Sequence, residues 1–402
     1  MSFCFKLTTC FFVFSILITS CSSPAPKAEK TAVINDSLRI KDSLPPEKTV
    51  KQTIPVNDSL DELAGIIAAT LSESNLYPQI TSGPAYQNYR KEFSCRWNHF
   101  DSTRVTTLVQ FQDSVLSKSL DSNNTLFYPF SGPDYLYAGR FFPKVQHYVL
   151  VGLEPVGSLD ALSKVKPDSL GGYFNALHTS LNAILKFSFF RTNSMEEDLK
   201  KEDLDGVIHL LFLFLKREGN GIISCRPFQI DSLGQKNYYS SFSAQKKSAS
   251  KSKGLEIQFV SVDQQLKVLD YLSVNLSDPA LKKNRGVMAF IGRDSTCITY
   301  LKGASYLLHK AYFSRIRQSI LTRSSAVVQD DSGIALHYFL SSNRKWKFQL
   351  YGQYTEPISM FRKLYQPSLD SLYQKQGAVP LGFGIGYNFK DNNSNLMIAI
   401  PN

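Results

Sequence analysis

The stretch LFYPFSGPDYLYAGRFFP, residues 126–143, and the segment HYVLVGL that follows at 147–153 decide the fold prediction. The apolar run 126–130 predicts a buried strand, and it stops at a polar Ser-Gly-Pro-Asp turn. Residues 134–141 then have helical character, and 147–153 is again strand-like. A strand–helix–strand unit of this length favours two parallel strands joined by a right-handed crossover.

Helical and extended patterns continue to interleave along the rest of the chain. Helices are predicted at 84–97, 103–116, 169–189, 205–216, 301–321 and 357–374. Strands are predicted at 221–230, 326–329 and 381–389, with hairpins at 255–262/267–276 and 335–340/345–354. The sequence therefore predicts a mixed α/β or α+β fold, with a central mixed sheet covered by helices. We expect a single large globular domain over 58–402, with a possible subdivision near 231–254.

The N-terminus has the organisation of an export signal. Lys6 precedes an apolar run that is shorter than the roughly 20 residues needed to cross a bilayer, which predicts a signal peptide over 1–20. Its end, LITSC at 17–21, resembles the lipobox of bacterial lipoproteins. That resemblance implies that Cys21 becomes the new N-terminus and carries lipid on its thiol and amine. An ordinary secretory signal that contains a cysteine is the alternative.

Four segments of the chain also resemble uncharacterised lipoproteins of Gram-negative bacteria. They are the stretch 126–143 and the segments LEPVG at 153–157, YLLHKAYFS at 306–314 and VQDDSGI at 328–334. The resemblance implies attachment to a membrane through Cys21, with the outer membrane as the expected location and the domain facing the periplasm or the cell exterior. It implies no molecular activity.

Residues 21–57 predict a flexible tether. The segment is rich in proline and charge and has no aromatic residue, so it cannot bury enough apolar surface to offset the cost of ordering. The globular domain is expected to begin at Asp58, which can cap a helix.

The 402-residue chain is 43% hydrophobic and carries a net charge of +11, which indicates a globular protein that favours anionic surfaces. Its lysine-rich stretch 237–254 predicts contact with anionic lipid headgroups; a solvated loop is the alternative. Nucleic acid is not expected as a partner, because the aromatic residues of that stretch precede the lysines instead of alternating with them. The four lysines are Lys246, Lys247, Lys251 and Lys253.

Three cysteines remain in the predicted domain: Cys95, Cys225 and Cys297. They show no C-x-x-C spacing, so neither a zinc site nor a redox motif is indicated, and no cofactor or metal is predicted. Buried free thiols are the simpler interpretation, and one disulfide between two of the three cysteines is the alternative.

The turn after the first strand is one candidate site. Ser131 could act as a nucleophile with Asp134 beside it, and His147 is the histidine that the predicted topology could bring near. The sequence departs from the G-x-S-x-G elbow, however, because the first glycine is absent, and Pro133 removes a backbone donor. The structural alternative is that Ser131 caps the following helix.

The second candidate is the pair Asp330 and Asp331, which follows another predicted strand. Adjacent carboxylates can bind a cation or serve as acid and base, whereas Asp-Asp-Ser-Gly is also ordinary turn chemistry.

Two classes of function follow from these features. The first is a non-enzymatic envelope protein whose tethered domain binds a ligand, a glycan or a partner protein. The second is an envelope hydrolase or transferase that uses the 131–134 or the 330–331 loop. The enzyme hypothesis predicts that the two loops converge on one pocket with a histidine in reach.

Overall fold

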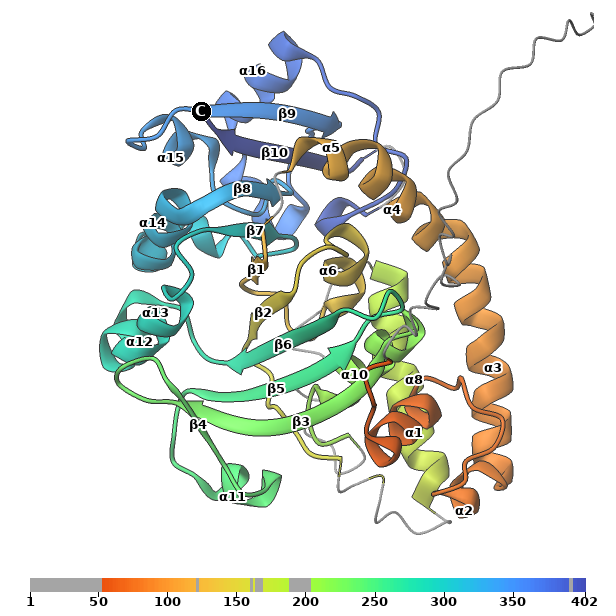
Figure 1. Ribbon diagram of the computed structural model, residues 1–402. Helices are drawn as coiled ribbons and strands as arrows, with labels where there is room; N and C mark the ends of the chain where they lie inside the picture. Colours follow the sequence, from red (N-terminus) through yellow and green to blue (C-terminus); the bar gives the residue numbers. More distant parts are fainter. Residues whose placement is uncertain (1–52, 121–122, 160–161, 163–168, 188–203, 390–392) are drawn as a thin grey trace, which may run out of the picture. The chain divides into compact units, whose positions relative to one another are not determined.

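A ten-stranded mixed sheet forms the centre of the protein (Figure 1). The computed structural model describes residues 53–120, 123–159, 162, 169–187, 204–389 and 393–402. The spatial order of the strands is β4-β3-β5-β6-β2-β1-β7-β8-β10-β9. In chain order they are β1 (Thr125–Tyr128), β2 (His147–Gly152), β3 (Gly221–Ile230), β4 (Lys236–Tyr238), β5 (Lys253–Val260), β6 (Leu266–Ser273), β7 (Cys297–Leu301), β8 (Ser324–Gln329), β9 (Trp346–Gly352) and β10 (Asn395–Pro401).

The five strands β6, β2, β1, β7 and β8 are mutually parallel, and antiparallel strands extend the sheet on both sides. The predicted crossover is confirmed: β1 pairs in parallel with β2, and the helix α6 (Tyr135–Phe141) connects them. The predicted hairpin of β5 and β6 is confirmed as well. The fold is thus the predicted mixed α/β class in a single globular body.

Helices cover both faces of the sheet, as the burial of parallel strands requires (Figure 1). Alternate strand residues point to opposite faces, so Tyr128 and Tyr148 join one core while Phe127 and Val149 join the other. The first core is covered by α1 (Asp58–Ile67), α3 (Pro84–Phe100), α4 (Thr106–Phe111), α6, α8 (Leu170–Phe187) and α10 (Ile208–Arg217). The second is covered by α12 (Asp278–Lys283), α13 (Arg285–Ile291), α14 (Ser314–Arg323), α15 (Leu336–Leu340) and α16 (Pro367–Gln376).

Two predicted strands are wrong. Residues 336–340 form the helix α15, whose Leu336 and Phe339 are buried, and the β9 segment predicted to pair with them pairs with β10 instead. Residues 381–389 are irregular, with a short 3-10 turn at Gly386–Asn388 where Gly386 has a φ of 64°. The strand that fills the place between β8 and β9 is β10, whose apolar run pairs with both.

The start of the body also differs from the expectation. Asn57, not Asp58, caps α1 by accepting a hydrogen bond from the Leu60 N–H at 3.1 Å. The Asn57 N–H itself donates to the Ile222 oxygen of β3 at 2.8 Å, so the last residues of the predicted tether lie on the body. The predicted signal peptide, Cys21 and the tether up to residue 52 lie outside the described residues.

The region near 231–254 belongs to the same sheet, because β4 pairs with β3. It also contains the short helix α11 (Phe242–Lys247), which packs beside β3.

Candidate functional site

The carboxyl ends of the five parallel strands meet at one edge of the sheet. At this edge β1 and β7 are neighbours, but the chain leaves β1 toward β2 on one side and leaves β7 toward β8 on the other. Open α/β sheets bind ligands in the crevice at such a switch point. The loops that follow β1 and β8 here carry four of the residues singled out in the sequence: Ser131, Asp134, Asp330 and Asp331.

The loop after β1 is a helix cap, but not the predicted one. Ser131 is 3% exposed, and its hydroxyl donates to the backbone oxygens of Gly132 at 2.9 Å and Val151 at 3.4 Å. Asp134 caps α6 by accepting a hydrogen bond from the Tyr137 N–H at 3.3 Å. The proposal that Ser131 caps the helix is therefore wrong, and its hydroxyl is engaged with main-chain oxygens.

Lys302, directly after β7, forms an ion pair with Asp134 of this loop. Its Nζ lies 2.6 Å from Asp134 Oδ2, and that oxygen also accepts the Tyr128 hydroxyl at 2.7 Å. The ammonium lies 3.4 Å from the centre of the Tyr137 ring. Both charged side chains are at most 2% exposed, so the pair has lost its hydration and depends on these contacts.

Asp330 and Asp331 follow β8 in the same region and are also buried. Asp330 accepts hydrogen bonds from the backbone N–H groups of Gly303 at 2.9 Å and Ser332 at 3.0 Å. Asp331 accepts from Asn395 Nδ2 at 2.9 Å and from the Tyr306 hydroxyl. Burial and then the charge of Asp331 raise the pKa of Asp330 to about 7, and burial raises the pKa of Asp331. Within the described ranges neither carboxylate forms an ion pair.

The backbone around the crevice is strained. Phe130 has a φ of 61°, and Ser305 and Tyr306 have φ values of 52° and 53°. A left-handed conformation costs an L-residue about 1–2 kcal/mol, and such residues cluster at functional sites. A pocket of about 90 Å³ opens beside these residues, between the ends of β1, β2, β6 and β7.

His309, which the sequence analysis did not select, lies near this edge, and His337 lies close to it. The His309 ring centre lies 5.1 Å from that of Tyr306, the residue that donates to Asp331. Burial lowers its pKa to about 4, and its Nε2 has no hydrogen-bond partner within the described part of the chain. His147 begins β2 and therefore lies at the opposite edge from Ser131. The expectation that His147 approaches Ser131 is wrong, because parallel strands place a strand start and a strand end on opposite sides.

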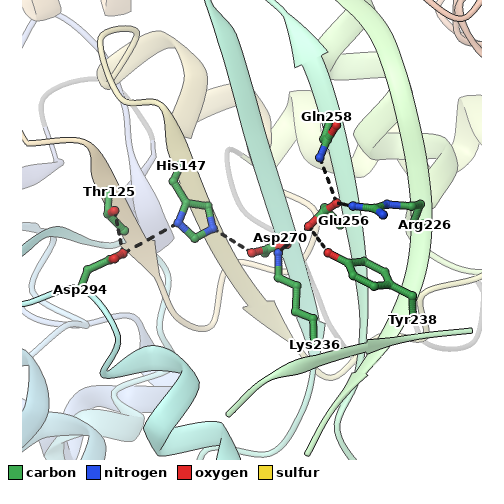
Figure 2. A network of polar contacts seen from close by, with 9 residues as sticks. All are labelled: Thr125, His147, Arg226, Lys236, Tyr238, Glu256, Gln258, Asp270 and Asp294. Atoms are coloured by element: carbon green, nitrogen blue, oxygen red, sulfur yellow. Dashed lines mark hydrogen bonds and ion pairs between the residues drawn. The ribbon is translucent and has the colours of Figure 1, made fainter.

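His147 instead belongs to a row of charged side chains that crosses the sheet, shown in Figure 2. Its Nε2 lies 2.8 Å from Asp270 Oδ2, and its Nδ1 lies 3.8 Å from Asp294. Lys236 bridges Asp270 at 2.6 Å and Glu256 at 2.7 Å. Arg226 pairs with the other oxygen of Glu256.

This row, the Arg226–Asp294 network, alternates in charge along its length. Burial alone would lower the pKa of His147, but hydrogen bonds to Asp270 and Asp294 outweigh that effect and raise the pKa to about 8. Hydrogen bonding to His147 lowers the pKa of Asp294 to about 2 despite its partial burial. With His147 protonated, three cations face three carboxylates.

A large cavity, about 620 Å³, lies at the amino edge of the parallel strands. We call it the Glu218 cavity. Its wall includes residues of α6, the turn between β5 and β6, and the end of α10. The polar residues that line it are Gln112, Tyr135, Arg140, Lys144, Gln146, Tyr148, Glu218, Asn220, Ser261, Asp263, Gln265 and Lys267.

Three buried polar atoms of the Glu218 cavity have no hydrogen-bond partner among the described residues: Arg140 Nε, Glu218 Oε1 and Asn220 Nδ2. Arg140 Nε and Glu218 Oε1 lie 3.5 Å apart, an ion pair without a hydrogen bond. Burial raises the pKa of Glu218 to about 7. A Cβ on Gly139 would lie 2.3 Å from a Glu218 oxygen, so the glycine makes room for the carboxylate. A cleft of this size with convergent polar groups and a perturbed acid is the usual form of a small-ligand site.

The predicted lysine loop is partly ordered. Lys246 and Lys247 end α11, and Lys246 Nζ lies 3.2 Å from Asp205. Lys251 is exposed, and Lys253 begins β5. Their contact with an anionic surface stays a prediction.

Cys95, Cys225 and Cys297 are all free, and they are exposed, half-buried and buried, respectively. Burial raises the pKa of the Cys225 and Cys297 thiols, as expected of inert cysteines.

A comparison of the chain with protein families, with curated proteins and with solved structures finds no match. In the part of the chain that the structure describes, no helix is long and apolar enough to span a membrane. Across the same residues, no group of three or more acidic, histidine or cysteine side chains is arranged to hold a metal ion.

Sequence reasoning missed Lys302, His309 and Glu218. Lys302 had one usable signal, since a lysine directly after the apolar strand CITYL is placed at a strand end. Glu218 lies in the segment REGN, whose sequence predicts the end of a helix. Nothing in that local sequence indicates that the side chain is buried.

Proposed function

We propose that this protein is an envelope lipoprotein, anchored through Cys21, whose globular body binds a small polar ligand in the Glu218 cavity. The observation that carries the proposal is a set of three buried atoms without a hydrogen bond on the wall of a 620 Å³ space, two of which, Arg140 Nε and Glu218 Oε1, are held only by their 3.5 Å ion pair. Leaving a buried donor or acceptor unsatisfied costs about 1–3 kcal/mol. A ligand that supplies the missing partners recovers that free energy.

The charges of the wall favour an acidic ligand. Arg140, Lys144 and Lys267 contribute three cations, against the carboxylates of Glu218 and Asp263. Because the pKa of Glu218 is about 7, this carboxyl is partly protonated at neutral pH, and the cationic surplus is larger still. Small carboxylates with hydroxyl groups match both the charge and the unpartnered hydrogen-bonding atoms.

Binding is tested by calorimetry with a panel of small hydroxycarboxylates and neutral sugars. We expect a carboxylate to bind with a dissociation constant of about 1 mM or below. Val262 lines the cavity and is 71% exposed, so Val262→Trp should obstruct the mouth without loss of folding and abolish binding. Leu233→Trp, at a residue that is 76% exposed and does not line the cavity, is the matched control and should bind normally. Equal binding by Val262→Trp and the native protein would refute the assignment of the cavity.

The anchor is tested separately. Cys21→Ala should move the protein from the membrane fraction to the soluble fraction and prevent incorporation of labelled palmitate. If the native protein takes up no palmitate, the lipidation proposal fails while the cavity proposal stands.

The alternative function is an envelope hydrolase or transferase at the carboxyl edge. It is favoured by the proximity of the buried Asp134–Lys302 ion pair to Asp330, with His309 beside the Tyr306–Asp331 contact. The burial of Ser131 argues against its use as the nucleophile. The test is turnover of chromogenic ester and phosphate substrates, with His309→Gln as the variant that should abolish it. The enzyme proposal would be refuted if the native protein showed no turnover, or if the His309→Gln variant retained it.

A further inference from the structure

The small pocket at the carboxyl edge has an acidic floor and an apolar wall. Its volume is about 90 Å³, and it is lined by the ends of β1, β2, β6 and β7. Glu154, two residues after β2, is its one ionisable side chain. We call it the Glu154 pocket. Its wall includes Gly303, which donates a backbone hydrogen bond to Asp330, and it shares no lining residue with the Glu218 cavity.

The fold makes specific room for the Glu154 carboxylate. A Cβ on Gly152 would lie 2.3 Å from Glu154 Oε2, and one on Gly132 would lie 3.5 Å from both carboxylate oxygens. Gly132 has a φ of 54°, a conformation that glycine adopts without strain. Gly152 at the end of β2 and Gly132 in the loop after β1 thus leave a recess that the carboxylate occupies.

Glu154 is 1% exposed and lacks a cation. Its Oε2 accepts the Leu153 N–H at 3.0 Å and the Tyr271 hydroxyl at 3.3 Å. Its Oε1 accepts no hydrogen bond from the described residues, and no ion pair to Glu154 occurs among them. A buried carboxylate is normally paired with a cation or bound to a metal. The free oxygen lines the pocket and can therefore accept a donor from outside the chain, and a positively charged donor would also balance the carboxylate.

The rest of the wall is suited to an alkyl chain with a cationic end. Phe130 and Phe313 pack edge to face, with ring centres 5.6 Å apart. Aromatic faces attract ammonium groups as well as methylene groups. Leu153 stands at the rim and is 56% exposed, so the pocket is open to solvent there. The apolar side chains of the wall are Phe130, Val151, Leu153, Val274, Leu276, Leu307 and Phe313.

We propose that the Glu154 pocket binds a primary alkylammonium group, with the nitrogen donating to Glu154 Oε1 and the alkyl chain against Phe130 and Phe313. The volume corresponds to about three water molecules, at roughly 30 Å³ each in the liquid. That space holds a chain of a few carbon atoms and excludes larger ligands. Such a group is either a free small amine or the end of a lysine side chain.

The test is titration of the native protein with n-butylammonium chloride near neutral pH, followed by calorimetry and by saturation-transfer NMR. We expect saturable binding with a dissociation constant on the order of 1 mM, typical of so few heavy atoms. n-Butanol, which has the same chain without the charge, should bind at least roughly tenfold more weakly. A lysine flanked by glycines in a capped tripeptide distinguishes the sources: equal or tighter binding indicates a lysine side chain, and exclusion of the peptide indicates a free amine.

Glu154→Gln keeps the shape of the side chain and removes its charge, and it should weaken butylammonium binding by roughly tenfold or more. Glu73→Gln, at an exposed glutamate, removes the same charge elsewhere and should leave binding unchanged. If Glu154→Gln does not fold, Leu153→Trp at the exposed rim provides the test and should obstruct the pocket. Absence of saturable binding, equal binding of n-butanol, or unchanged binding in both pocket variants would overturn the proposal. None of these outcomes depends on the Glu218 cavity.

Discussion

Two groups of charged side chains are built on the same sheet, and they differ in charge balance. The Arg226–Asp294 network (Figure 2) alternates cation and carboxylate across neighbouring strands. Each carboxylate there has a cation beside it, including the fully buried Asp270, which lies between Lys236 and His147. The geometry keeps His147 protonated, and the row is complete without a ligand.

At the carboxyl edge of the sheet, buried carboxylates outnumber the cations that pair with them in the described part of the chain. Lys302 pairs with Asp134, while Asp330, Asp331 and Glu154 are buried without an ion pair among the described residues. The raised pKa of Asp330 follows from this arrangement, since burial penalises a charge that has no partner. The difference teaches that a balanced network stabilises a fold, whereas unpaired buried charges leave protonation and binding open.

The largest effect is expected at Lys302. Lys302→Met removes the cation and leaves Asp134 charged and buried, which should lower the free energy of unfolding by about 3–5 kcal/mol. Urea denaturation measures this loss. Adding Asp134→Asn to the same protein should recover part of the stability, because the uncompensated charge is then removed.

Lys247→Met, at an exposed lysine, is the matched control and should change the unfolding free energy by less than about 0.5 kcal/mol. A loss at Lys302 no greater than that of the control would show that the ion pair contributes nothing, and the contrast between the two regions would be drawn wrongly.

A smaller, pH-dependent effect is expected at His147. Its pKa is about 8 in the fold and 6.5 in the reference state, so it stabilises the protein fully below about pH 6.5 and loses that contribution as the pH rises through 8. The shift of 8 − 6.5 = 1.5 units corresponds to roughly 2 kcal/mol. His147→Gln should therefore be less stable than the native protein at about pH 6, by an amount that shrinks by roughly 2 kcal/mol at about pH 9.

His99→Gln, at an exposed histidine of α3, serves as the control for this measurement and should follow the native pH profile. A stability difference for His147→Gln that is independent of pH would mean that His147 is not charged in the network.

The smallest effect is expected at Arg226, the outer end of the same row. Its side chain is 46% exposed, so solvent and salt screen its pair with Glu256. Arg226→Ala should cost less than about 1 kcal/mol, and the loss should fall further in high salt. Arg226→Lys retains the charge and should be closer to the native protein. If Arg226→Ala lost as much unfolding free energy as Lys302→Met, the exposed Arg226–Glu256 pair and the buried Lys302–Asp134 pair would contribute equally, and the contrast between them would be wrong.

Local features of the sequence predicted the frame of the carboxyl edge. The apolar run before Ser131 and the helix after Asp134 were both expected, and so was their parallel connection to β2. The choice of Ser131 as the cap failed because Ser and Asp are similar caps, and the helix begins only at Tyr135, so that Asp134 stands at the N-cap. The pairing of Asp134 with Lys302 had no local signal at all.

The wrong prediction of a strand at 381–389 also arose because the sequence pattern contains no information on tertiary contacts. Its alternating pattern was sound, but the place beside β8 went to β10, whose residues are more apolar and carry no glycine. Competition between two segments for one sheet position is settled by packing against neighbours, which periodicity does not contain.

The sequence by itself predicted a mixed sheet covered by helices and the strand–helix–strand unit of β1, α6 and β2. An export signal with a lipobox ahead of the body stays a prediction. Those features depend on residues close together in the chain. The tertiary structure decided which carboxylates meet a cation and which do not, because the partners come from strands far apart in sequence. The balanced row through His147 and the unpaired Glu154 therefore exist only in the folded protein.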